Sequence, residues 1–342
     1  MLAREVIINN VLDIDVIETE LDINHLKPSE CLIESYVSLI SPGTELSRVY
    51  GLKEGATYPV KPGYCSVGKV LRKGSAVRHV NEGDIVLFGG PHASLQIFDY
   101  EHSDGGMLYR LDEKTSYEDG SFLMMSWIAC NGILPAEVKL GDTVAIFGLG
   151  SLGLVASILY KQMGTKVIAI DPIQHRCDMA LAFGVDEVVS VSPEKQHEEI
   201  MRLTNNLGAD IVIDASGLSV CIEAAIHAAA VHGQVILLGS PRSPYVSDMS
   251  PMLYELHTKM LTVVGALNRR YPFNEVPGSR INMKRTLKYL EGLMHQKIID
   301  SSKFISHHID PNKEDLLKAY EGLMNKKEEY TMVVINWKKE TK

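Results

Sequence analysis

One segment constrains the fold of this chain more than any other. An apolar run, Val144–Phe147, leads into Gly148-Leu-Gly150-Ser-Leu-Gly153 and then into an apolar-periodic stretch. The run predicts a buried strand, and the stretch predicts a helix that begins near Ser151. Gly148 permits a tight turn, Gly150 lets the backbone approach a pyrophosphate, and Gly153 lets helix and strand pack closely. Free amide N–H groups at the helix start would face the phosphates, so the segment predicts a dinucleotide-binding turn in a parallel sheet.

An acidic residue after the next expected strand indicates which dinucleotide would bind. Asp171 follows Val167–Ile170, where a carboxylate can accept hydrogen bonds from both adenosine ribose hydroxyls and would repel a 2′-phosphate. We therefore expect NAD rather than NADP, although Arg176 is close enough in sequence to weaken this preference. A glycine turn that binds nothing, or another nucleotide, is the alternative. Further cofactor contacts are expected at the helix start and at other strand ends, namely at Ser151, Leu152, Ser216, Gly217, Gly239, Ser240, Gly265 and Ala266.

The pattern of residues changes near residue 118. Residues 1–118 hold short alternating or β-branched runs, such as Cys31–Ile40, broken by glycine and proline, which predicts an irregular, mostly antiparallel β-domain. Residues 119–269 alternate strand, turn and helix, which predicts an α/β fold with a doubly wound parallel sheet covered on both faces. Residues 270–342 hold two amphipathic helices and a last strand, Thr331–Ile335, and we expect them to return to the first domain. The length of 342 residues fits about two domains of roughly 150 residues each.

In the middle part, the expected elements are well defined. The expected strands are Thr143–Phe147, Lys166–Ile170, Glu187–Val189, Asp210–Asp214, Gln234–Leu238 and Leu261–Val264. The expected helices cover residues 151–163, 174–183, 194–205 and 218–230.

Charge and cysteine content exclude several classes of protein. The 34 Lys+Arg and 43 Asp+Glu give a net charge of −9, so the phosphates of a nucleic acid would be repelled. The five cysteines form no CxxC pair, which favours reduced thiols in a cytoplasmic protein, and the N-terminus lacks the apolar core of a secretory signal.

Two uncharged stretches, Gly120–Ala136 and Thr143–Tyr160, imitate a membrane span in length. Pro135 in the first and the glycine turn in the second favour soluble structure, so we expect no membrane partner.

Three further segments carry a resemblance to a known family. They are Lys139-Leu-Gly-Asp-Thr-Val144, Gly208-Ala-Asp-Ile-Val-Ile-Asp-Ala-Ser-Gly217 and Gly233-Gln-Val-Ile-Leu-Leu-Gly239. With the glycine turn, they make the chain resemble, over nearly its whole length, the medium-chain dehydrogenase/reductase superfamily of zinc alcohol dehydrogenase-like enzymes. The resemblance implies a GroES-like catalytic domain in residues 1–118, a Rossmann NAD-binding domain in 119–269 and a return segment, 270–342, that completes the catalytic domain. It also implies an active site between the domains.

The resemblance fails at the metal site. Family members with catalytic zinc have a Cys before Gly-Thr/Ser-Asp, a His in Gly-His-Glu, and a Cys or acid shortly before the Rossmann domain. This chain has Pro42 at the first position, Tyr64 at the second and, by approximate spacing, Met124 at the third. Zinc prefers thiolate, imidazole or carboxylate ligands, so these residues do not suit it. We expect no metal, with Cys65 and His92 as the remaining candidate ligands.

The same segments resemble a zinc-free branch of the family. Ser41-Pro42-Gly43-Thr44-Glu45 and Pro62-Gly63-Tyr64 are similar to runs in bacteriochlorophyllide dehydrogenase-like and cyclitol or sugar dehydrogenase-like proteins. Without zinc, hydrogen-bond donors and a proton acceptor must stabilise the alkoxide formed when a secondary alcohol is oxidised.

The resemblance also points to three candidate catalytic residues. Thr44 matches the family's proton-relay hydroxyl, Tyr64 would donate a hydrogen bond to a carbonyl oxygen, and His92 would be the titratable end of the relay. Their structural alternatives are a turn-stabilising threonine, a packing tyrosine and a core or loop histidine. The candidate cleft residues are Ser41, Glu45, Ser47, Trp127 and Asn131. Among these, Ser47 matches a further relay position, Glu45 is explained more simply as a solvated or turn-capping carboxylate, and Trp127 equally fits an inter-domain core.

Together these patterns predict a cytoplasmic, zinc-independent, NAD(H)-dependent oxidoreductase. It would transfer hydride between the nicotinamide and a secondary alcohol or ketone of a polyol, cyclitol or sugar-like substrate, a class that rests on the resemblance alone. Two alternatives stay open, an NAD(P)H-dependent enone or quinone reductase and a non-catalytic NAD-binding sensor. A phosphorylated substrate also stays open because of Arg242, Arg269 and Arg270. We expect a homodimer or homotetramer, because the apolar strand Leu261–Ala266 would form a sheet edge for a partner subunit.

Overall fold

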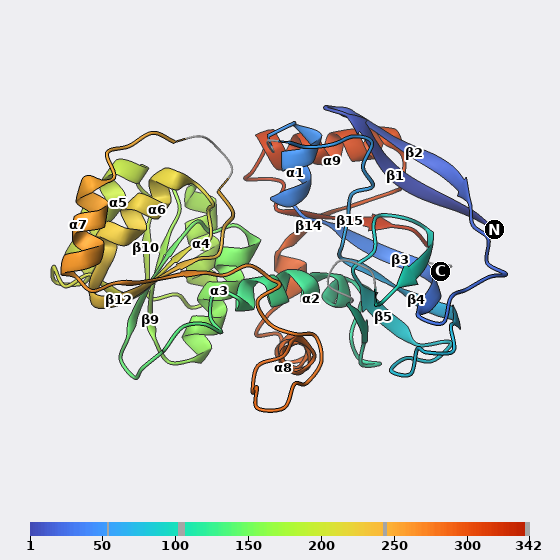
Figure 1. The fold of residues 1–342 in the computed structure, drawn as a ribbon. Coiled ribbons are helices and arrows are strands. Elements are labelled where there is room, and N and C mark those ends of the chain that lie inside the picture. The colour runs from blue at the N-terminus through green and yellow to red at the C-terminus, as the bar shows by residue number, and fades with distance from the viewer. Residues whose placement is uncertain (53–54, 102–106, 242–244, 339–342) are drawn as a thin grey trace. The chain divides into compact units, whose positions relative to one another are not determined.

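The computed structural model describes residues 1–52, 55–101, 107–241 and 245–338 (Figure 1). The chain divides into two compact units, one formed by Met1–Met125 with Tyr271–Lys342 and the other by Ser126–Arg270. The boundary expected after residue 118 falls inside a helix, α2 (Tyr117–Cys130), which begins in the first unit and ends in the second.

The first unit is built on a mostly antiparallel sheet. Within the described residues, seven strands have the order β14-β15-β3-β4-β5-β7 with β6 paired to β3 off this path, and β1 and β2 form a separate hairpin. β15 runs antiparallel to β3, with Val333 opposite Ile40, so a C-terminal strand lies within the sheet of the N-terminal strands. The strands are β1 (Leu2–Asn10), β2 (Asp13–Glu20), β3 (Glu30–Ile40), β4 (Ser66–Lys73), β5 (Ile85–Phe88), β6 (Leu95–Asp99), β7 (Leu108–Arg110), β14 (Ile305–Ile309) and β15 (Met332–Asn336).

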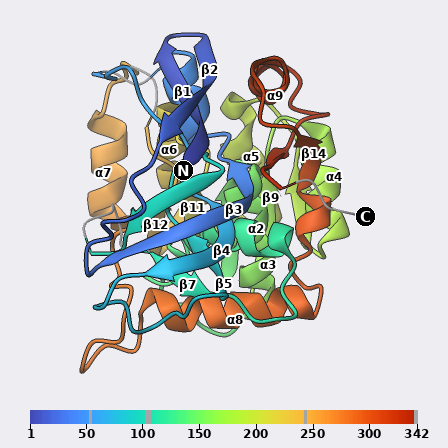
Figure 2. The ribbon, with the colours of Figure 1, turned by 90° about the vertical axis from the view of Figure 1, so that its right-hand side faces the viewer.

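The helices of this unit are α1 (Thr44–Val49), α8 (Met283–His295), α9 (Lys313–Asn325) and a short 3-10 helix, η1 (Ser301–Lys303). Asn312 caps α9, because its side chain accepts a hydrogen bond from the backbone N–H of Asp315. The helical spacing of Leu316, Tyr320 and Leu323 gives α9 an apolar face. This face packs in one core with residues of α1, β1 and β15. α8 and α9 lie at opposite ends of the unit in Figure 2.

The second unit is a six-stranded parallel sheet in the described residues, with the order β10-β9-β8-β11-β12-β13. This is the strand order of a Rossmann fold, so the expected fold class is confirmed. Its strands are β8 (Thr143–Phe147), β9 (Lys166–Ile170), β10 (Glu187–Val189), β11 (Ala209–Asp214), β12 (Ala229–Leu237) and β13 (Thr262–Gly265), and its helices are α3 (Ser151–Gln162), α4 (Gln174–Ala182), α5 (Pro193–Leu203), α6 (Ser219–Ala228) and α7 (Ser250–Thr258).

Successive strands are added toward one edge of this sheet up to β10 and toward the other edge from β11 onward. α3 and α4 connect β8 to β9 and β9 to β10, whereas α5, α6 and α7 lead toward β13. Right-handed crossovers therefore place these two groups of helices on opposite faces. Ile200, Ala225 and Leu256, from α5, α6 and α7, pack in one core with the sheet. The reversal lies between β8 and β11, which is the place where such sheets bind ligands.

Several elements differ from expectation. β8, β9 and β10 have the expected bounds, but the strand expected at Gln234 begins at Ala229. Short elements such as α1, β7 and α7 were not expected. Helix α7 has no fully buried residue, and a helix that buries no face does not need apolar residues at helical spacing, which is the signal that predicts a helix. Most of the uncharged stretch Gly120–Ala136 is helix α2. In the part of the chain that is described, no helix has the length and apolarity needed to cross a membrane.

Candidate functional site

The glycine turn after β8 has the geometry that a dinucleotide needs. Gly148 has φ +90°, and a Cβ there would lie 2.9 Å from Ser216. A Cβ on Gly153 would lie 1.8 Å from the carbonyl oxygen of Gly148, so only glycine fits this helix against its turn. At Gly150 the space is open, and no side chain caps α3 there. Open space in front of uncapped helix amides suits a pyrophosphate, so the residues present fit a nicotinamide dinucleotide.

The ends of the neighbouring strands continue this site. A Cβ on Gly239 would lie 2.3 Å from the backbone nitrogen of Gly217, so the strand ends of β11 and β12 touch. The buried Asp214 shapes this loop, since it accepts hydrogen bonds from the hydroxyl of Ser216 at 2.6 Å and from the N–H of Gly217 at 3.2 Å. The structure thus brings Gly148, Ser216, Gly217 and Gly239 together. Gly265 ends β13, two strands from β11. Asp214 was missed, although its position at a strand end is the same signal that singled out Asp171.

Asp171 is tied into the turn by its own chain. It is 3% exposed, and its Oδ2 accepts a hydrogen bond from the N–H of Leu149 at 2.8 Å. Its Oδ1 accepts from the N–H of Ile173 at 2.9 Å, and Nη1 of Arg176 lies 3.3 Å from Oδ2. An ionised carboxylate has about four acceptor positions, so three are already used. For Asp171 to accept bonds from both ribose hydroxyls, Arg176 would have to move away.

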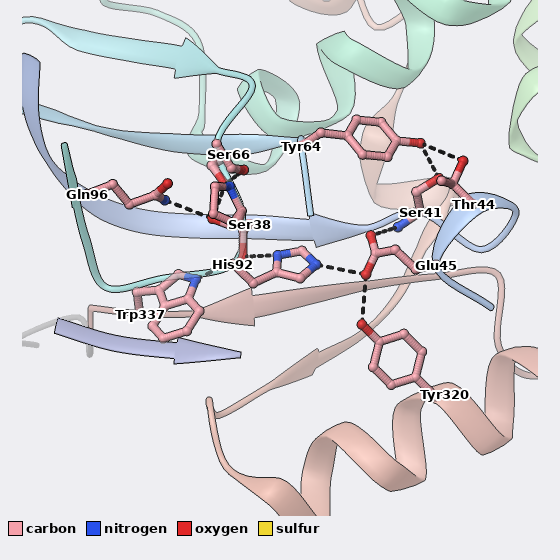
Figure 3. Close-up of polar contacts among 12 residues, drawn as sticks. Ser38, Ser41, Thr44, Glu45, Tyr64, Ser66, His92, Gln96, Tyr320 and Trp337 are labelled. Carbon is pink, nitrogen blue, oxygen red and sulfur yellow. Dashed lines mark hydrogen bonds and ion pairs between the residues drawn. The ribbon is translucent and has the colours of Figure 1, made fainter. Parts of the chain in front are cut away.

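In the first unit, three hydroxyl groups meet where β3 ends and α1 begins (Figure 3). The phenol of Tyr64 donates a hydrogen bond to Oγ of Ser41 at 2.5 Å, and it lies 3.4 Å from Oγ1 of Thr44. Burial raises the pKa of the Tyr64 phenol well above its ordinary value, so the phenol is neutral and can donate at physiological pH. Thr44 is exposed, so this hydroxyl cluster (Ser41, Thr44 and Tyr64) reaches the surface of its unit.

Behind the hydroxyl cluster, Glu45 is the centre of a buried network. Its Oε1 accepts a hydrogen bond from the N–H of Ser41 at 2.8 Å. Its Oε2 accepts from the hydroxyl of Tyr320 at 2.7 Å and lies 2.9 Å from Nε2 of His92. Glu45 is 1% exposed, so the expectation of a solvated carboxylate was wrong. The bond to Ser41 does cap the turn before α1, but its other partners come from distant parts of the sequence.

His92 lies on the inner side of this network. Its side chain is completely buried, and its Nδ1 lies 2.8 Å from Oγ of Ser38. The same Ser38 oxygen accepts a hydrogen bond from Nε1 of Trp337. His92 therefore contacts Glu45 rather than the hydroxyl cluster. Sequence reasoning missed Ser38, Tyr320 and Trp337. Tyr320 lies on the apolar face of α9, where a tyrosine is expected to be a packing residue.

The other expected cleft residues make hydrogen bonds within their own units. The hydroxyl of Ser47 donates to the backbone carbonyl of Thr44 at 2.7 Å. Trp127 and Asn131 are buried, and the amide of Asn131 donates to the carbonyl of Trp127 at 3.0 Å. Arg242 lies outside the described residues.

The residues at the expected metal positions do not fit zinc. Pro42 has no side-chain donor atom, and Tyr64 is a neutral phenol that donates a hydrogen bond. Burial raises the pKa of the Cys65 thiol well above its ordinary value, whereas zinc requires a thiolate. Both ring nitrogens of His92 already contact Ser38 and Glu45. Among the described residues, no group of three or more His, Cys, Asp or Glu side chains is placed to hold a metal ion.

Comparison with known proteins gives the same fold and a related sequence. Residues 151–280 match the family model of zinc-binding dehydrogenases. Galactitol-1-phosphate dehydrogenase from Escherichia coli has the same fold, with a TM-score of 0.82 at 19% identity, covering 97% of this chain and 99% of that chain. D-guloside 3-dehydrogenase of Escherichia coli is 31% identical over 170 residues, which are 49% of this chain and 48% of the relative. The aligned part thus spans about half the length of this curated relative.

The sequence match to the zinc-binding dehydrogenases covers residues 151–280, and the solved structures, at 19% identity or less, show that the fold of the whole chain is shared. The matched residues 151–280 include α3 and Asp171 but not Pro42, Tyr64 or Met124. Two other structures with this fold hold cofactors. A short chain alcohol dehydrogenase from Escherichia coli CFT073 is complexed with NADH, with a TM-score of 0.80, 16% identity and coverage of 98% of this chain and 99% of that one. A protein of Sinorhizobium meliloti assigned to the zinc-binding dehydrogenases is bound to NADP, with a TM-score of 0.76, 19% identity and coverage of 98% and 99%.

Proposed function

We propose that this protein is a zinc-independent, NAD(H)-dependent oxidoreductase. It transfers hydride between the nicotinamide and a secondary alcohol or ketone of a polyol, cyclitol or sugar-like substrate. The observation that carries the proposal is Tyr64, a neutral, hydrogen-bonding phenol at the sequence position of a zinc ligand. The substrate class is supported by the sugar-derivative and polyol-phosphate dehydrogenases among the similar proteins. The location we propose is the cytoplasm, consistent with five buried, free cysteines.

The dinucleotide would be held by the glycine turn and by Asp171. Gly150 leaves room for the pyrophosphate, and the amides at the start of α3 bind it. When bound, the nicotinamide supplies the hydride acceptor or donor. Asp171 favours NAD, whereas Arg176 offers a cation beside it that would tolerate a 2′-phosphate, so we propose a preference for NAD rather than exclusion of NADP.

The hydroxyl cluster supplies the polar chemistry. In ketone reduction, the Tyr64 phenol turns its single hydrogen from Oγ of Ser41 to the carbonyl oxygen, where negative charge develops, and the Ser41 hydroxyl then donates to the phenol oxygen. The alkoxide takes its proton from the phenol, and the phenol regains one through the neighbouring hydroxyl groups of Ser41 and Thr44, of which Thr44 is exposed to solvent. A fixed donor replaces the electrostatic role that a metal would otherwise have.

The test is NADH formation by purified protein after treatment with a strong chelator. The protein is supplied with NAD or NADP and a panel of polyols, cyclitols and sugars, free and phosphorylated, and its metal content is measured in the same sample. We expect turnover with NAD in protein containing less than stoichiometric metal. Turnover that disappears with the chelator and returns with Zn²⁺ would contradict zinc independence. Binding of NADH without turnover of any alcohol would instead favour the enone reductase or the sensor.

A further inference from the structure

Glu45 joins three segments that are far apart in the chain. Ser41 belongs to the turn between β3 and α1, His92 to the loop before β6, and Tyr320 to α9, 275 residues from Glu45. Ser41, His92 and Tyr320 are buried together with Glu45, so the whole network is shielded from water. Burial of a carboxylate is costly unless hydrogen bonds compensate for lost water. These contacts therefore hold the start of α1 in one place.

Ser41 connects this network to the hydroxyl cluster. Its backbone N–H donates to Glu45 at 2.8 Å, and its side-chain oxygen accepts the phenol hydrogen of Tyr64 at 2.5 Å. A shift of Glu45 would move the backbone of Ser41 and with it the acceptor of the phenol. Within the described contacts, the phenol of Tyr64 is thus linked through Ser41 to a carboxylate with which it shares no hydrogen bond. Figure 3 shows the hydroxyl cluster on one side of Glu45 and Tyr320 on the other.

We infer that Glu45 and Tyr320 are positioning residues that set the orientation of the Tyr64 phenol through Ser41. The C-terminal helix α9 thereby helps to build the catalytic geometry, although its only polar contribution to the network is the Tyr320 hydroxyl, within the contacts described. The catalytic consequence rests on the proposed function, whereas the effect on the phenol is a property of the folded protein alone. This difference allows the two ideas to be tested separately.

Two substitutions remove the contacts with little change in volume. Tyr320→Phe keeps the ring in the core and removes only the hydroxyl that donates to Glu45. Glu45→Gln replaces an acceptor oxygen with an N–H₂ group, which must then face a partner that donates to the native carboxylate. Glu45→Asp keeps a carboxylate. Tyr330→Phe is the matched control, because Tyr330 stacks on His307 with ring centroids 3.8 Å apart and has no bond to Glu45 among the described contacts.

The first measurement needs no substrate. The chain carries 3-fluorotyrosine at position 64 alone, introduced by amber suppression, and the ¹⁹F NMR signal reports the environment of the phenol. We expect the signal to shift or split in Tyr320→Phe and in Glu45→Gln. In Glu45→Asp it should lie closer to the native position than in Glu45→Gln. In the control Tyr330→Phe it should be unchanged. Unchanged signals in folded Tyr320→Phe and Glu45→Gln would overturn the inference. If Glu45→Gln does not fold, Tyr320→Phe decides the question.

The second measurement uses whichever substrate the chelator experiment identifies. Loss of one hydrogen bond to the network should lower kcat of Tyr320→Phe about threefold to tenfold, with KM for NAD unchanged. A lower kcat in Tyr320→Phe with an unchanged ¹⁹F signal would contradict positioning through Tyr64. A changed ¹⁹F signal in a protein that turns over no alcohol would support the positioning network and contradict only the proposed function.

Discussion

At the scale of residues, a single half-buried phenol carries most of the proposed chemistry. Tyr64 has a raised pKa because burial disfavours the phenolate, so the phenol keeps its hydrogen well above neutral pH. A group whose folded pKa is raised stays protonated beyond its unfolded pKa, which is near 10 for tyrosine. Tyr64 is therefore a donor, not a base, across the range from pH 7 to 10.

Removing this donor should impair catalysis more than binding. We expect Tyr64→Phe to lower kcat/KM about 10²-fold to 10³-fold, as for loss of a donor to a developing oxyanion. NADH affinity should stay within about twofold, because the glycine turn and Asp171 are untouched. Steady-state kinetics and fluorescence titration with NADH measure the two quantities. Equal kcat/KM in the variant and the native protein would exclude Tyr64 as the donor.

We expect Arg176 to influence cofactor preference through its contact with Asp171. Its guanidinium lies 3.3 Å from the carboxylate of Asp171. This contact occupies one acceptor position of Asp171 that the ribose could otherwise use, and the guanidinium itself offers a cation to a 2′-phosphate. Arg176→Ala should therefore raise the ratio of the Kd for NADPH to the Kd for NADH about threefold to tenfold. Titration with both cofactors measures this ratio. A fall in the ratio would show that Arg176 does not favour a 2′-phosphate.

At the scale of elements, two glycines in the turn between β8 and α3 meet two different requirements, one of packing and one of ligand approach. Gly153 is required by packing, because its Cβ would meet the carbonyl oxygen of Gly148 at 1.8 Å. Gly150 has open space around its Cβ position and φ −69°, which any residue can adopt. The motif thus combines a constraint on folding with a constraint on ligand approach.

These two constraints can be separated by one pair of substitutions. Gly153→Ala should lower the free energy of unfolding by about 1–3 kcal/mol through overpacking. Gly150→Ala should cost under about 1 kcal/mol of stability but weaken NADH binding, because the methyl group enters the space of the pyrophosphate. Urea denaturation and NADH titration on both variants test this. Unchanged NADH affinity in Gly150→Ala would argue against a pyrophosphate at this helix start.

The exposed edge of the parallel sheet suggests self-association at the scale of the whole molecule. β13 pairs with β12 on one side, and no described strand pairs with its other side. Val263 on β13 is 42% exposed, and Tyr254 on α7 is 70% exposed. An open apolar strand edge is a template for pairing with another chain. We propose that a second copy of the chain covers this edge in a symmetric dimer or tetramer.

Sedimentation at micromolar concentration tests this proposal. We expect at least a dimer for the native chain and a shift toward the monomer in Val263→Lys, because a charge on an edge strand opposes pairing. Leu181→Lys serves as the control, because Leu181 is 47% exposed on α4, which packs on β9 and β10 at the other end of the sheet. A native chain that sediments as a monomer would refute the proposal.

Where local geometry decides the structure, the sequence was sufficient. The bounds of β8, β9 and β10 follow from short apolar runs between glycine turns, and the turn between β8 and α3 follows from glycines a few residues apart. The absence of zinc, argued from proline and tyrosine at the expected ligand positions, remains a prediction. The prediction of NAD, and the roles of Thr44, Tyr64 and His92, remain predictions.

Only the tertiary structure decided the environment of Glu45. Its sequence neighbours suggest an exposed turn, but its partners His92 and Tyr320 are 47 and 275 residues away. Burial depends on which distant segments pack together, and periodicity within one segment carries no information about a hydrogen bond to another. For the same reason Tyr320 looked like a packing residue of an amphipathic helix, although its ring packs in the core while its hydroxyl holds Glu45.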